Sequence, residues 1–71
     1  MSRRQRQLDE LCELCRSGGI GRAIDLAFEH FTRFGADEVV LRLLATAVEE
    51  SEVPERIRHR LAELRDTFAA A

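Results

Sequence analysis

The sequence predicts an all-α domain built from four short antiparallel helices. Apolar residues recur at three- and four-residue spacing along most of the 71-residue chain, which is the period of an amphipathic helix. Glycines at 18–21, Gly35 and Pro54 divide the chain into four such segments. Because the connections are only two to five residues long, neighbouring helices must run antiparallel, as two hairpins that close into a bundle or stack as a repeat. We expect a single domain over residues 1–71, with helices at about 3–16, 20–34, 37–50 and 54–69.

The first segment, 3–16, carries one apolar stripe at positions i, i+3, i+4 and i+7 of a helix. Gly18 follows it and can adopt the left-handed conformation in which helices often end. We therefore expect one face of this helix to pack against the rest of the domain. The stripe consists of Leu8, Leu11, Cys12 and Cys15.

The second segment, 20–34, has an unbroken apolar face, and Gly35 supplies its end. Three of the four phenylalanines lie here, so this helix is expected to anchor the core. The face comprises Ile20, Ala23, Ile24, Ala27, Phe28, Phe31 and Phe34.

The third segment, 37–50, begins at Asp37, whose carboxylate can cap the free amides of the first turn. Apolar residues cover well over half of its circumference, and Arg42, Thr46 and Glu49 form a narrow polar strip. That surface is too wide for a helix with one neighbour. The helix must be central in the domain, or it must meet another chain.

The fourth segment, 54–69, starts with Pro54, which suits the first turn of a helix. Either Val53 or Ser51 could cap it, and the sequence does not distinguish them. The apolar positions repeat at four, three and four residues, which is the spacing of a narrow packing seam flanked by arginines. The seam consists of Ile57, Leu61, Leu64 and Phe68.

The turn between the first two helices resembles the middle of a tetratricopeptide unit. In the stretch 15–24, Gly18, Ala23 and Ile24 match the glycine and the Ala-Ile pair of that family. The resemblance covers under half of the chain, since the second hairpin has almost none of the signature. It implies a scaffold that binds peptides of other proteins in a groove and has no catalytic residues. The sequence departs from the family pattern at Cys15, Ala27 and His30.

Composition restricts the cellular setting. The net charge is −2, and all 11 basic residues are arginine, a bias typical of a GC-rich, bacterial genome. No apolar run reaches the length of a membrane span, and the charged start leads into no signal-peptide core. We therefore expect a cytoplasmic protein with no membrane partner, whose two cysteines are reduced.

Cys12 and Cys15 form the one motif that suggests metal chemistry. Two thiolates at i and i+3 could share a zinc ion, with His30 and His59 completing four ligands. Both cysteines, however, belong to an apolar stripe, where cysteine acts as a small hydrophobic residue. They also lie near a helix C-terminus, where the dipole disfavours thiolate. We expect structural cysteines and no cofactor, with a zinc or redox role as an alternative.

Two groups of arginines suggest a second alternative, a nucleic-acid-binding or transcription-regulatory domain. Helix packing could bring the two groups together into one basic surface. Acidic residues lie beside both groups, which favours solvated faces instead. The groups are Arg3, Arg4 and Arg6 near the start, and Arg56, Arg58 and Arg60 in the fourth segment.

The leading hypothesis is a non-catalytic protein–protein interaction module. Neither histidine has an obvious nucleophile or orienting carboxylate in the sequence, so an enzyme is not expected. The excess apolar surface of the third helix would bind a second copy of the chain, as a homodimer or another homo-oligomer, or a client protein. The predicted partner-binding residues are Val40, Leu41, Leu44, Val48, Ile57, Leu61, Leu64 and Phe68.

Overall fold

A computed structural model describes residues 2–69 and confirms the all-α fold with four helices. Within this range there is no strand, and no helix is long and apolar enough to cross a membrane. The predicted domain span of 1–71 also includes residues 1, 70 and 71, which lie outside the described residues. The helices are α1 (Arg3–Arg16), α2 (Ile20–Phe34), α3 (Glu38–Glu50) and α4 (Glu55–Ala69).

The helix ends follow from local chemistry. Asp37 is the N-cap of α3, because its Oδ1 accepts a hydrogen bond from the Val39 amide at 3.1 Å. Gly18 and Gly35, which follow α1 and α2, both have φ of +89°. At α4, the Pro54 carbonyl accepts from the Arg58 amide at 3.4 Å, so Pro54 immediately precedes the helix. The predicted starts of the third and fourth helices are therefore each one residue early.

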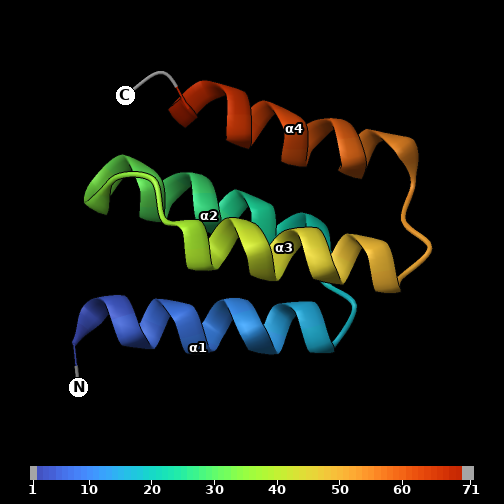
Figure 1. The fold of residues 1–71 in the computed structure, drawn as a ribbon. Coiled ribbons are helices and arrows are strands. Elements are labelled where there is room, and N and C mark those ends of the chain that lie inside the picture. The colour runs from blue at the N-terminus through green and yellow to red at the C-terminus, as the bar shows by residue number, and fades with distance from the viewer. Residues whose placement is uncertain (1, 70–71) are drawn as a thin grey trace.

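The four helices alternate in direction, with α2 and α3 between α1 and α4 (Figure 1). The helix α1 packs against α2 and α3, and α4 packs against the same two helices. Within the described residues, α1 and α4 make no contact with each other. The Cα atoms span 32 × 28 × 15 Å, so the molecule is a slab rather than a closed cylinder of helices.

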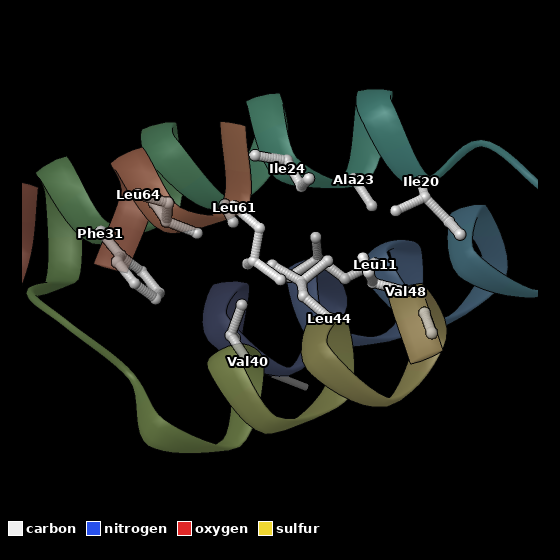
Figure 2. Close-up of a cluster of buried hydrophobic side chains, with 12 residues drawn as sticks. Leu11, Ile20, Ala23, Ile24, Phe31, Val40, Leu44, Val48, Leu61 and Leu64 are labelled. Carbon is white, nitrogen blue, oxygen red and sulfur yellow. The ribbon is translucent and has the colours of Figure 1, made fainter. Parts of the chain in front are cut away.

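All four helices contribute to one hydrophobic core (Figure 2). Its largest side chain is Phe31 of α2, which is 1% exposed. The prediction that α2 anchors the core is confirmed, because α2 supplies five of the twelve buried apolar residues. The core comprises Leu11, Ile20, Ala23, Ile24, Ala27, Phe31, Val40, Leu44, Ala47, Val48, Leu61 and Leu64.

The wide apolar arc of α3 is explained by its central position. This helix packs against α1, α2 and α4, so different parts of its circumference are covered by different neighbours. Val39, at 58% exposed, and Phe34 at the end of α2, at 45%, are the exposed large apolar side chains of the described chain. The sequence left two explanations for the wide apolar surface of this helix, a central position or contact with another chain. The central position of α3 accounts for most of that surface.

Candidate protein-interaction site

The predicted partner-binding residues divide into two groups. Five of them belong to the core and are at most 5% exposed, whereas Leu41, Ile57 and Phe68 are half-buried. The buried five fill the space between the helices of one chain. They are Val40, Leu44, Val48, Leu61 and Leu64.

A groove runs along the surface between α3 and α4, and Leu41 and Phe68 lie in it. The larger part has a volume of about 610 Å³, and a shallower continuation has about 200 Å³. Ala45 and Arg65 line both parts. The two parts therefore form one continuous surface, which we call the α3–α4 groove. The larger part is lined by Ala36, Glu38, Leu41, Arg42, Ala45, Arg65, Phe68 and Ala69, and the continuation adds Val48, Glu49, Arg58, Leu61 and Ala62.

The position of α4 that creates this groove is fixed from the other side, by α2. The Phe68 ring packs edge-on against Phe31, with centroids 5.2 Å apart, and lies 6.1 Å from Phe28. The Arg60 guanidinium stacks over the Phe28 ring at 4.2 Å. These aromatic contacts hold α4 against α2, and small alanine side chains leave the α3–α4 side hollow.

The charges around the groove are mostly basic on the α4 side. Arg58 and Arg65 have no ion pair within the described residues, and on α3 Arg42 lies 3.8 Å from Glu38. The groove therefore has an apolar floor, Arg58 and Arg65 on its α4 side with no ion pair among the described residues, and the carboxylates of Glu38 and Glu49 on its α3 side. The sequence predicted the apolar seam of the fourth helix and the arginines beside it. It did not indicate that alanines would leave a hollow between α3 and α4.

A buried polar cluster joins α1, α2 and the start of α3. His30 of α2 is a fully buried polar residue, with 0% of its surface exposed. Its Nδ1 lies 2.6 Å from Gln7 Oε1, and its Nε2 lies 3.3 Å from Asp37 Oδ2. The same carboxylate oxygen accepts from Arg4 Nη2 at 2.9 Å. We call these four residues the His30 cluster.

The electrostatics of the His30 cluster favour an ionised Asp37. Burial alone would raise the pKa of Asp37, but the hydrogen bond with His30, the charge of Arg4 and the Val39 amide together lower it below its usual value. The Gln7 amide can turn either its oxygen or its NH₂ group to the ring, so it can pair with Nδ1 as acceptor or as donor. The cluster ties three helices together and offers no accessible reactive group.

The structure does not bring the two arginine groups together. They lie on α1 and α4, at opposite edges of the slab, with α2 and α3 between them (Figure 1). Arg4 is engaged by Asp37, and Arg60 lies 3.4 Å from Asp25 and 2.8 Å from Glu63. A single basic surface made of both groups is therefore not present in this arrangement.

The two cysteines differ in environment. Cys12 is exposed, so the expectation that it packs in the apolar stripe of the first helix is wrong, whereas Cys15 is half-buried against the core. Burial raises the pKa of the Cys15 thiol, and the neighbouring Cys12 raises it further. Within residues 2–69 no three His, Cys, Asp or Glu side chains are grouped to hold a metal ion. His59 is exposed, with its Nε2 3.4 Å from Glu55.

These features define a small all-α protein of two antiparallel helical hairpins with an open apolar groove. No protein-family model matches the chain, and comparison with curated proteins and with solved structures found no match. The resemblance of residues 15–24 to a tetratricopeptide unit therefore stays a prediction.

Proposed function

We propose that this chain is a non-catalytic protein–protein interaction module of a bacterial cytoplasm, and that the α3–α4 groove is its binding surface. The observation that carries the proposal is the groove itself, an apolar hollow of about 610 Å³ on a molecule of 71 residues. Exposed apolar hollows bordered by polar residues are typical of sites where another molecule docks. The occupant is a second copy of the chain or a client protein.

The distribution of polar groups supports a binding role over catalysis. His30 is fully buried and both of its ring nitrogens are hydrogen-bonded, and His59 is exposed with only Glu55 beside it. General acid–base catalysis needs a titratable group within reach of a bound substrate. The residues that line the groove are instead alanine, leucine, phenylalanine, arginine and glutamate, which suit docking of a side-chain surface.

The test compares Leu41→Glu with Thr46→Glu. Leu41 lines the groove, whereas Thr46 is an exposed residue of the same helix that does not. The solution mass of each variant and of the native chain is measured by light scattering over a dilution series, and proteins captured from the source cell are compared. We expect Leu41→Glu to lose the association that the native chain and Thr46→Glu retain, with helical circular dichroism unchanged.

The result that would overturn the proposal is equally specific. If the native chain is monomeric at all concentrations and captures the same proteins as Leu41→Glu, the groove is not a functional binding surface. A loss of association that Thr46→Glu shares would also count against this surface, because it would point to the added charge rather than to the groove.

A further inference from the structure

The packing of α3 indicates what kind of element fits the α3–α4 groove. The helix α3 lies alongside the hairpin α1–α2 and contacts both of its helices. The hairpin α3–α4 has the same antiparallel form, and α2 covers one of its sides by contacting both of its helices. The groove lies on the other side, and its lining includes no residue of α1 or α2. Inside this molecule, the element that packs against both helices of a hairpin is itself a helix. A helix that lies along the groove would insert one stripe of side chains while its other face stays in solvent.

The arginines on the α4 side specify the charge of the occupant. Arg58 and Arg65 are seven residues apart, so they lie on one face of α4 about 10 Å apart along its axis. Neither has an ion pair within the described residues. Arg65 borders both parts of the groove, whereas Arg58 borders only the smaller part, which Glu49 lines from the α3 side. Carboxylates on an adjacent helix at the same seven-residue spacing would meet both guanidinium groups.

A second copy of this chain does not offer that surface. The exposed large apolar side chains of the described residues are Phe34 and Val39, which flank the turn between α2 and α3 and form no stripe along a helix. Two hollow grooves placed face to face would not fill each other. The occupant is therefore a helix with an exposed apolar stripe, which the described part of this chain lacks.

We propose that the α3–α4 groove binds an amphipathic helix of another protein, with its apolar stripe on Leu41, Ala45 and Phe68 and with acidic residues seven apart facing Arg58 and Arg65. This inference rests on the proposed function and names the class of partner for the same site. The apolar stripe supplies affinity, and the two arginines select the sign of the charge and the orientation of the helix.

The experiment uses a set of designed helical peptides as probes. Each has about 20 residues, which is long enough to hold helical structure in water. The set carries leucine, isoleucine or phenylalanine stripes, each made in two forms with glutamate or with lysine at a seven-residue spacing beside the stripe. Binding to the full chain is measured by fluorescence anisotropy. We expect the glutamate form to bind about tenfold more tightly than the lysine form, and salt to reduce that difference.

Two variants and one matched control locate the binding. The double variant Arg58→Glu with Arg65→Glu should reverse the preference, so that the lysine form binds more tightly. Arg22→Glu with Arg33→Glu changes the net charge equally on the exposed side of α2 and should leave the preference unchanged. Ala45→Glu places a charged side chain on the floor of the groove and should abolish binding of both peptide forms. Thermal unfolding by circular dichroism verifies that each variant is folded.

Each failure has its own meaning. If both peptide forms bind equally and Ala45→Glu abolishes both, the acidic preference is wrong while the groove remains a binding surface. If no peptide in the set binds more tightly than about 1 mM, but the chain self-associates and Ala45→Glu prevents it, the occupant is a second copy. If neither peptide binding nor self-association occurs, the partner inference and the proposed use of the groove are both overturned.

Discussion

Replacing Asp37 with asparagine separates two contributions that this residue makes. Its Oδ1 caps α3 by accepting from the Val39 amide, and its Oδ2 accepts from Arg4 and lies 3.3 Å from His30 Nε2. Asparagine has the same shape, and it is as good a helix cap as aspartate. If capping were the whole contribution of Asp37, the substitution would leave stability almost unchanged.

The geometry predicts a substantial loss instead. An amide has one oxygen, so it cannot accept from the Val39 amide and from Arg4 at the same time, and its NH₂ group opposes whichever of these donors it faces. The contact with His30 also loses the negative charge of the carboxylate. A buried hydrogen bond to a charged group contributes about 1.5–3 kcal/mol, and a half-exposed ion pair such as that with Arg4 contributes at most about 1 kcal/mol. We expect Asp37→Asn to lower the free energy of unfolding by about 2–3 kcal/mol, over half of the ~3–5 kcal/mol typical of so small a domain.

The pH dependence gives a second readout of the same substitution. Burial raises the pKa of Asp37, but the contacts with His30, Arg4 and the Val39 amide outweigh burial and lower it. A carboxyl whose pKa is lower in the folded state stabilises the fold above its unfolded pKa of about 3.9, and this stability is lost as pH falls through the folded pKa. The native chain should therefore lose stability below about pH 4, and Asp37→Asn should lose less.

The assay is urea unfolding followed by far-ultraviolet circular dichroism at neutral and acidic pH. With a denaturant slope of about 1 kcal/mol per molar urea, the expected loss moves the midpoint by about 2–3 M at neutral pH. The control is Asp25→Asn, whose side chain is 67% exposed and 3.4 Å from Arg60; its effect should stay within about 0.5 kcal/mol. Equal midpoints for the two variants would refute the reasoning.

Three further substitutions or modifications test the core, a turn and the cysteines. Phe31→Ala should cost about 3–5 kcal/mol, enough to leave the chain unfolded by circular dichroism; a folded variant would show that the contact of Phe31 with Phe68 is dispensable. Gly18→Ala should cost about 1 kcal/mol, because φ is +89° there; an unchanged melting temperature would contradict this. Iodoacetamide should label Cys12 first, because it is exposed while burial raises the pKa of the Cys15 thiol; equal labelling by mass spectrometry would refute that order.

The helices could be predicted because their signals are local. Gly18 and Gly35 end helices through their own backbone conformation, and Asp37 caps α3 through an amide two residues away. The cap of α4 does not follow from the sequence, because proline is compatible with several positions at the beginning of a helix. The structure places neither Ser51 nor Val53 at the cap and gives that position to Pro54.

The His30 cluster could not be predicted, because its partners come from distant positions. Gln7 precedes His30 by 23 residues, and Asp37 follows it by seven. A histidine at the edge of an apolar face is buried only if such polar groups converge on it. The period of the helix gave no sign of that convergence. Cys12 was misplaced because the packed face of α1 is rotated away from it: Leu14 packs against the core together with Leu8, Leu11 and Cys15, whereas Cys12 is exposed.

The groove depends on how the two hairpins are placed, which no single segment encodes. In a closed bundle of four antiparallel helices, α1 and α4 would be neighbours. The apolar side of each helical hairpin would then be covered by the other hairpin. Here α3 packs on α1 and α4 packs on α2, so the hairpins lie side by side and α1 never reaches α4. The pair α1–α2 is covered on one side by α3, and the pair α3–α4 is covered on one side by α2. The outer side of α3–α4, where the groove lies, has no cover among the described residues. Leu41 and Phe68 are therefore half-exposed by the order of packing, even though their spacing along the sequence is that of core residues.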